Sequence, residues 1–185
     1  MIDDVMADAV RRMDKSVENT RREFTTIRTG RASTSLLDRV QVHVYGTTMP
    51  LNQLATISTP EPRLLTISPF DKSTIKDIER GILESDLGLT PSNDGQLVRL
   101  PVPQLTEERR RELVKQVRHL AEEGRVAARN VRRDAIHHLK DLEKSGEVGS
   151  DDVHRAEERL QKLTDEHVAA IDGALKAKEA EIMEV

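Results

Sequence analysis

The sequence predicts an α+β protein in which three long helices share one bundle and a small sheet domain is inserted after the first helix. Apolar residues recur at helical spacing in residues 3–28, in residues 107–144 and again from Ser150 onward. All 7 prolines of the 185-residue chain lie between the first two of these segments, where short β-like runs replace the helical period. Because this stretch separates the first helix from the other two, we expect it to be an insertion into the helical domain.

The first helix is predicted over residues 3–28, a segment without Gly or Pro. Its apolar positions, spaced by three or four residues, are Val5, Ala9, Met13, Val17, Phe24 and Ile27. The pattern stops at Thr29 and Gly30, and glycine adopts the left-handed conformation that often ends a helix. We therefore place the first crossing between the two domains at Thr29, Gly30 and Arg31.

Residues 30–105 are predicted to form a small mixed sheet with one helix. Four segments have the alternation or the β-branched content of strands, and turn residues separate them. These segments are residues 40–44, 54–58, 64–68 and 97–102. Residues 73–86, with Ile at helical spacing and Gly88 just beyond, predict the helix. Because Pro101 has no amide hydrogen to donate, we expect the last strand to lie at a sheet edge.

Residues 107–144 predict the second long helix, with Thr106 as its N-cap. Its apolar stripe contains Leu113, Val117, Leu120, Ala127, Val131, Ala135 and Leu142. Gly124 falls in the same stripe and costs about 1 kcal/mol of helix propensity relative to Ala. We therefore expect a close helix crossing or a slight bend there. Pro103, Gln104 and Leu105, just before this helix, are the second crossing, and the two crossings together predict a hinge.

The third long helix is predicted to begin at an N-cap Ser150 after a loop with two glycines. Its apolar positions predict a heptad seam of Val153, Ala156, Leu160, Leu163, His167, Ala170, Ala174 and Ala177. We interpret His167 as a histidine at the edge of the core with its polar tip outward, rather than as a ligand.

The net charge of −4 hides an uneven distribution: residues 106–144 carry +3 and residues 145–185 carry −6. At 3.6 residues per turn, six arginines of the second long helix fall within an arc of about 100°. They are Arg110, Arg111, Arg118, Arg125, Arg129 and Arg132, flanked by Lys115 and Arg133. The apolar stripe is centred about 120–130° away on the helix, so we expect these arginines to face outward together.

Two interpretations of this arginine face stay open. It is a basic ridge that binds structured RNA or an acidic protein surface, because guanidinium groups bind phosphate oxygens with two parallel donors. Otherwise it is a solvated helix face with intrahelical pairs to Glu.

Other chemistry has little support. The chain has no cysteine, which excludes thiolate sites, and only three aromatic residues, which argues against a surface for stacking bases. The six histidines are scattered, and there is no His-Glu-x-x-His, Gly-rich phosphate loop or Gly-x-Ser-x-Gly motif. No apolar run approaches the roughly 20 residues of a membrane span, and the acidic N-terminus is unlike a signal peptide. We expect a cytoplasmic monomer, not an enzyme, with no cofactor, metal site or membrane contact.

Five segments carry a family resemblance. They are Ile27-Arg-Thr-Gly-Arg-Ala-Ser, Ser85-Asp-Leu-Gly-Leu, Val102-Pro-Gln-Leu-Thr-Glu-Glu-Arg-Arg, Arg129-Asn-Val-Arg-Arg-Asp-Ala and Lys178-Glu-Ala-Glu-Ile-Met-Glu-Val. Together the chain resembles the ribosome recycling factor family over its whole length. Gly124 is a mild departure, because the resemblance suggests Ala as the commoner residue there.

The resemblance implies an L-shaped molecule: an antiparallel three-helix bundle of residues 1–29 and 106–185, and an inserted small β/α/β domain of residues 30–105 on a two-stranded hinge. It also implies ribosome recycling after translation termination. The chain would bind ribosomal RNA of the large subunit and, with elongation factor G and GTP, split the subunits and release messenger RNA and deacylated tRNA.

The resemblance also suggests which residues bind ribosomal RNA. The family's large-subunit contacts correspond to Arg110, Arg129 and Arg132, and its basic residues beside the hinge to Arg28 and Arg31. Arg118, Arg125 and Arg133 complete the candidate set because they belong to the same arginine face or flank it. A non-ribosomal coiled-coil adaptor or chaperone that grips proteins with its helices is the alternative function.

Overall fold

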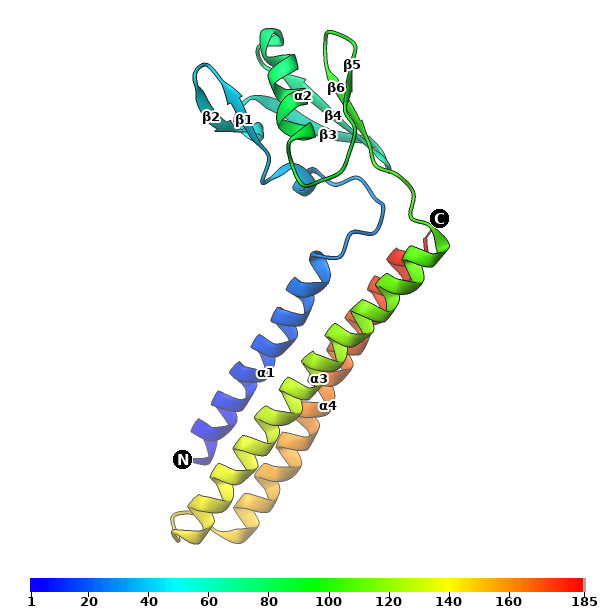
Figure 1. Cartoon of the computed structure of the whole chain (residues 1–185). Helices are drawn as coiled ribbons and strands as arrows, with labels where there is room; N and C mark the ends of the chain where they lie inside the picture. The colour runs from blue at the N-terminus through cyan, green and yellow to red at the C-terminus, as the bar shows by residue number, and fades with distance from the viewer. Residues whose placement is uncertain (185) are drawn as a thin grey trace. The chain divides into compact units, whose positions relative to one another are not determined.

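The computed structural model describes residues 1–184, which form two compact units (Figure 1). One unit combines residues 1–29 with the chain from Thr106 onward, and the other is Gly30–Leu105. The chain therefore leaves the first unit after Thr29 and returns to it at Thr106.

Three long helices build the first unit. They are α1 (Ile2–Thr25), α3 (Glu107–Lys144) and α4 (Ser150–Met183). Within this bundle α3 runs antiparallel to both α1 and α4 (Figure 1). Gly146, with φ +77°, lies in the short loop that joins α3 to α4. In the part of the chain that the structure describes, none of the helices combines the length and the apolarity that a membrane span needs.

The three helices approach each other closely at Gly124 of α3. A Cβ atom there would lie 2.2 Å from Thr20 Oγ1 of α1 and 3.2 Å from Ile171 Cδ1 of α4. Both neighbours are buried. The close crossing that the sequence predicted is therefore confirmed, and its physical cause is the absence of a side chain.

The buried stripe of α4 departs from the predicted heptad seam beyond Leu160. Thr164, Ile171 and Ile182 are buried, whereas Ala177 is exposed. Leu160, Ile171 and Ile182 are spaced by 11 residues, which is close to three full turns. On a straight helix, positions seven residues apart rotate by about 20° per heptad. The predicted seam positions therefore lie progressively farther from the core toward the C-terminus of α4.

The stripe of α3 shows the same kind of shift. Ala121 and Ala128 are buried, whereas the predicted Leu120 and Ala127 are half-buried. The helix itself has the predicted bounds, and the Thr106 hydroxyl accepts a hydrogen bond from the Arg109 amide at 3.1 Å. In contrast, α4 has Gly149 as its N-cap, and Ser150 is its first residue.

The second unit contains six strands and one α-helix. They are β1 (Gln41–Val44), β2 (Thr47–Pro50), β3 (Ala55–Glu61), β4 (Leu64–Pro69), α2 (Ile75–Leu83), β5 (Ser92–Asn93) and β6 (Val98–Pro101). Short 3-10 helices occupy residues 34–37, 51–53 and 72–74. β1 and β2 form a hairpin, and the other strands form a sheet in the order β3-β4-β6-β5.

Every strand pair is antiparallel, so the predicted mixed sheet was wrong. Two-residue turns join β1 to β2 and β3 to β4, and so short a connection can only produce an antiparallel pair. The strand prediction also placed β6 at an edge, but it lies between β4 and β5.

The position of Pro101 explains how a proline fits inside this sheet. Val102 N donates to Arg63 O at 2.8 Å, so the nitrogen of the preceding Pro101 faces the opposite side, toward β5. There β5 pairs only with Val98 and Arg99. The missing amide hydrogen of Pro101 therefore costs no ladder bond.

α2 packs against β1 over a core of fully buried side chains that includes Val42, Ile67 and Ile78. A Cβ at Gly81 of α2 would lie 2.9 Å from Gln41 O, so glycine permits this close packing. The predicted bounds were too wide at two helices: α1 ends at Thr25 and α2 covers only nine residues.

Candidate functional site

The arginines of α3 differ in what they bind inside the protein. Arg118 Nε donates to Glu179 Oε1 at 2.6 Å, and Arg125 Nη1 donates to Asp172 Oδ1 at 2.6 Å. Both carboxylates belong to α4, and the Arg125 side chain is only 19% exposed. The expectation that all arginines of this face point outward was therefore wrong for Arg125, whereas the Arg118 side chain is 63% exposed and faces outward while it bonds Glu179.

The pKa shifts of these arginines follow from their contacts. The hydrogen bond to Glu179, and then the charge of Glu179, raise the pKa of Arg118 above its ordinary value. Burial lowers the pKa of Arg125, but its hydrogen bonds to Glu122 and Asp172 and their charges outweigh burial and raise it. Both guanidinium groups are thus paired with carboxylates of the bundle itself.

Arg132 continues this row with a different partner. It lies seven residues beyond Arg125, and its Nη1 donates to Gln161 Oε1 of α4. Gln161 Nε2 in turn donates to Asp165 Oδ1 at 2.9 Å. The guanidinium therefore contacts a neutral carbonyl, and its Nε is buried without a hydrogen-bond partner.

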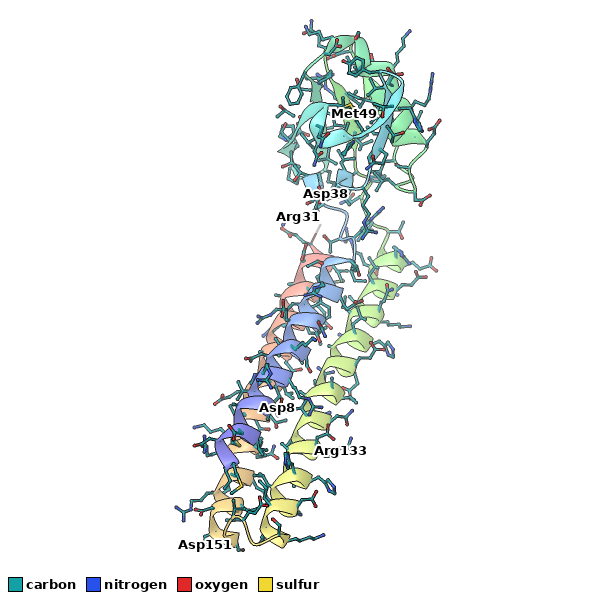
Figure 2. All side chains as sticks on the ribbon, turned by 90° about the vertical axis from the view of Figure 1, so that its left-hand side faces the viewer. Asp8, Arg31, Asp38, Met49, Arg133 and Asp151 are labelled. Carbon is teal, nitrogen blue, oxygen red and sulfur yellow. The ribbon has the colours of Figure 1, made fainter. Side chains whose placement is uncertain are left out.

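Arg110, Arg129 and Arg133 are also without a hydrogen-bonded carboxylate in residues 1–184. Arg110 is half-buried, and its Nε has no partner. Arg129 Nη1 lies 3.7 Å from Glu122 Oε1, too far for a hydrogen bond, and its side chain is 46% exposed. Arg133 Nη2 donates to the Asn130 amide oxygen at 2.5 Å, and Figure 2 shows Arg133 on α3.

These contacts divide the predicted arginine face into two groups. Arg111, Arg118 and Arg125 donate to carboxylates of Glu107, Glu179 and Asp172, respectively. Among the six arginines of this face and the flanking Arg133, four lack such a bond within residues 1–184, and we call them the open arginines. They are Arg110, Arg129, Arg132 and Arg133. Arg129 still has the Glu122 carboxylate 3.7 Å away, so its charge is partly compensated. A phosphate gains most from a guanidinium whose charge no nearby carboxylate compensates.

Arg28 and Arg31 do not belong to α3. They lie in the irregular segment after α1, on either side of Thr29 and Gly30, and both side chains are exposed. Thr29 is tied to the bundle, because its hydroxyl donates to Glu181 Oε1 at 3.1 Å.

The two connecting segments are fixed to one turn of the inserted unit. Ala32 N donates to Pro62 O at 2.7 Å, and Val102 N donates to Arg63 O at 2.8 Å. When the Gln104 side-chain amide is oriented with its oxygen toward the Arg63 guanidinium, that oxygen accepts a hydrogen bond from Arg63 Nη2 at 2.9 Å. Both segments therefore leave the β3–β4 turn side by side.

Gly30 and Leu105 mark the ends of these two segments. Gly30 has φ +77°, and a Cβ there would lie 3.1 Å from Leu105 Cγ. Backbone freedom and close packing at this point both depend on the missing side chain.

His167 is half-buried between two helices. Its Nε2 lies 2.7 Å from Asp14 Oδ1 of α1, and its Nδ1 lies 2.6 Å from Leu163 O. The polar tip of His167, which the sequence predicted to face outward, therefore contacts Asp14 of α1. Within residues 1–184 no group of three or more His, Cys, Asp or Glu side chains is arranged to hold a metal ion.

Helical periodicity along α3 alone did not predict the partners on α4. The signal was present: Arg118, Arg125 and Arg132 are spaced by seven residues, and so are Asp165, Asp172 and Glu179. Equal seven-residue spacing of opposite charges on adjacent antiparallel helices is typical of coiled-coil flanking positions.

Comparison with known proteins identifies the family. The chain matches the family model described as "Ribosome recycling factor" over residues 20–183. The chain belongs to the ribosome recycling factor family. Its function is accordingly ribosome recycling in protein biosynthesis, as a translation factor and not an enzyme.

Individual relatives agree with this assignment over the full length. The chain is 58% identical to the ribosome-recycling factor of Rubrobacter xylanophilus over 97% of each chain. It is 56% identical to that of Halalkalibacterium halodurans over the whole of both chains. The alternative of a non-ribosomal adaptor or chaperone is therefore set aside.

Two solved structures of ribosome recycling factors are similar to this chain. A solution structure has 42% sequence identity and a TM-score of 0.73, covering 100% of this chain and 98% of that one. The second has 44% identity and a TM-score of 0.62 over the whole of both chains. It belongs to models of the T. thermophilus factor and E. coli elongation factor G bound to the E. coli post-termination complex.

Proposed function

We propose that this chain binds ribosomal RNA of the large subunit through the open arginines and, with elongation factor G and GTP, splits the post-termination ribosome. Messenger RNA and deacylated tRNA are then released. The contrast between open and carboxylate-bonded arginines on α3 carries this proposal. The similar factor placed with elongation factor G on the post-termination complex supports the partners. Action on ribosomes also supports a cytoplasmic location for this chain.

The open arginines are suited to phosphate rather than to bases. From Arg110 to Arg133 they span 23 residue steps of one helix, or about 35 Å at 1.5 Å per residue. A stiff row of this length can follow several phosphates along a folded RNA. Phosphate contacts fix position and orientation without reading sequence, which is what a factor acting on every post-termination ribosome requires.

Arg118 and Arg125 have a different role in this proposal. Their direct bonds to Glu179 and Asp172 hold α3 on α4, so they stabilise the binding surface rather than touch RNA. Arg28 and Arg31, exposed beside the connection, provide further phosphate contacts.

We further propose that Thr29, Gly30 and Arg31 together with Pro103, Gln104 and Leu105 form the hinge. Neither segment belongs to a helix or a strand. Each segment adjoins a residue, Ala32 or Val102, that is hydrogen-bonded to the β3–β4 turn. A change of backbone angles within the two segments would therefore swing the inserted unit as one body. Elongation factor G would push this unit while the RNA-bound bundle stays in place.

A binding measurement tests the proposal. Arg132→Glu should weaken binding to isolated large subunits by about tenfold or more, because a phosphate contact is lost and a repulsive charge is added. The matched control is Arg111→Glu, which removes an equally charged side chain of the same helix that is already bonded to Glu107. It should have a much smaller effect.

Salt provides a second test of the same contact. Affinity for the large subunit should fall steadily as salt rises, because phosphate contacts release counterions. Equal binding of the Arg132→Glu variant and the parent protein, with unchanged thermal unfolding of both, would refute the proposed surface. A flat salt response would refute phosphate binding altogether.

A further inference from the structure

The contact between Arg132 and Gln161 differs in chemistry from the two contacts next to it. Arg118 and Arg125 each meet a carboxylate of α4 directly. The carboxylate that corresponds by seven-residue spacing to Arg132 is Asp165. Asp165 is instead bonded to the side-chain amide of Gln161, and the amide oxygen meets the guanidinium. A neutral group thus separates this pair of opposite charges.

The hydrogen bonds also determine which way the Gln161 amide faces. A carboxylate oxygen of Asp165 only accepts hydrogen bonds, so the amide must turn its NH2 group toward Asp165. Its carbonyl oxygen then faces Arg132, whose guanidinium only donates. The opposite orientation would set donor against donor and acceptor against acceptor. Asp165 therefore holds Gln161 in the one orientation that can hold Arg132.

The backbone on both sides of this contact is firmly packed. Val131, next to Arg132, and Leu160, next to Gln161, are both buried in the bundle core. Only Nη1 of Arg132 is bonded within residues 1–184, and its Nε is covered. The Nη2 donors thus stay available on a side chain whose direction is fixed.

We propose that Gln161 and Asp165 are positioning residues for phosphate binding by Arg132. They order the guanidinium before RNA arrives, and the amide between the charges keeps Asp165 from neutralising it. Ordering in advance removes the entropy cost that a mobile arginine would incur on binding. This inference rests on the proposed role of Arg132 in binding ribosomal RNA.

Two substitutions at Gln161 separate order from charge. Gln161→Leu removes the orienting carbonyl and leaves every charge in place. Its affinity for large subunits should fall by about three- to tenfold, the cost of ordering one long side chain. The slope of affinity against salt should stay unchanged, because the number of phosphate contacts is the same.

Gln161→Glu places a carboxylate directly against Arg132, as in the two neighbouring pairs. Binding should weaken toward that of Arg132→Ala. The slope of log affinity against log salt should become shallower by about one, which corresponds to one lost phosphate contact, as is expected for Arg132→Ala. The side chain of Gln161 is exposed, so both variants should unfold at the temperature of the parent protein. A structural defect would instead lower the unfolding temperature.

The outcomes distinguish the inference from the proposal beneath it. If Arg132→Ala weakens binding and Gln161→Leu binds within about twofold of the parent, a difference too small for an ordered side chain, the positioning role is refuted. If Arg132→Ala itself binds like the parent, the proposed RNA contact is refuted and the positioning role with it. Weaker binding of both variants at unchanged unfolding temperature establishes the inference.

Discussion

Replacing Gly124 by alanine tests whether the close crossing of the three helices depends on a missing side chain. The new Cβ would lie 2.2 Å from Thr20 Oγ1 and 3.2 Å from Ile171 Cδ1. The Ile171 methyl ends a flexible side chain and can shift by a few tenths of an ångström. The Thr20 hydroxyl is held by a hydrogen bond to Ser16 O at 2.9 Å, on a short and buried side chain. Either α1 moves or Thr20 changes its rotamer.

Two opposing terms determine the magnitude of the effect. Alanine gains about 1 kcal/mol of helix propensity over glycine, and overpacking a buried site costs about 1–3 kcal/mol. We therefore expect Gly124→Ala to lower the free energy of unfolding of the bundle by about 1 kcal/mol. Gly173→Ala is the matched control, because a Cβ at this α4 position meets no atom within 4 Å. It should raise the free energy of unfolding by about 1 kcal/mol.

Urea unfolding followed by the helical circular dichroism signal measures both variants, since three long helices dominate that signal. Combining Gly124→Ala with Thr20→Ala removes the hydroxyl that the Cβ would meet. The double-mutant cycle should then show a favourable coupling of about 1 kcal/mol or more. If Gly124→Ala stabilises the bundle as much as Gly173→Ala does, the crossing is not limited by space and the reasoning fails.

Three further expectations concern an ion pair, a carboxyl group and the hinge. Asp172→Asn should lower the free energy of unfolding by less than about 1 kcal/mol, because its pair with Arg125 is partly exposed, and pelleting with ribosomes should be unchanged. The hydrogen bond from Tyr45 lowers the pKa of Asp71. The ionised Asp71 carboxylate therefore adds to the free energy of unfolding above its ordinary pKa, and this contribution is lost as pH falls through the lowered pKa. Tyr45→Phe should raise the pKa of Asp71 in an NMR titration. The variant should unfold with a lower free energy than the parent protein at neutral pH, and this difference should disappear in acid. Gly30→Ala should slow subunit splitting, measured by light scattering with elongation factor G and GTP, while binding is retained.

Each of these expectations has its own contradicting result. A large loss of ribosome binding by the Asp172→Asn variant would place Arg125 in the RNA contact. An unchanged titration of Asp71 after the tyrosine substitution would show that the phenol is not its main partner. Gly46→Ala, which also substitutes a left-handed glycine (φ +72°) but meets no neighbour, is the control for the hinge. Equal slowing by this variant would argue against a hinge effect.

Local signals were sufficient for several elements. The bounds of α3 followed from Thr106 as a cap, the acidic first turn and the absence of proline, all of which act within a few residues. The close crossing at Gly124 was also predictable, because a glycine inside an apolar stripe has a cost that close packing can offset. The family itself followed from ordered motifs along the chain.

The directions of side chains between helices were not predictable in the same way. A helical wheel placed six arginines on one arc, but it does not contain the position of α4. That position brings Glu179 and Asp172 within hydrogen-bond distance of Arg118 and Arg125, and it covers most of the Arg125 side chain. It also leaves Arg132 on a neutral amide. Only the packed bundle separates the open arginines from the others.

Residue order was thus enough to predict the three long helices, the insertion of the sheet segment between them, the close crossing at Gly124 and the family. The packing of the elements against one another set the buried stripe of α4, the place of β6 inside an antiparallel sheet, and the partner of each arginine. The physical reason is one of range. Caps, propensities and periodicity depend on neighbours along the chain, whereas the face that a residue buries or bonds depends on which surface packs opposite.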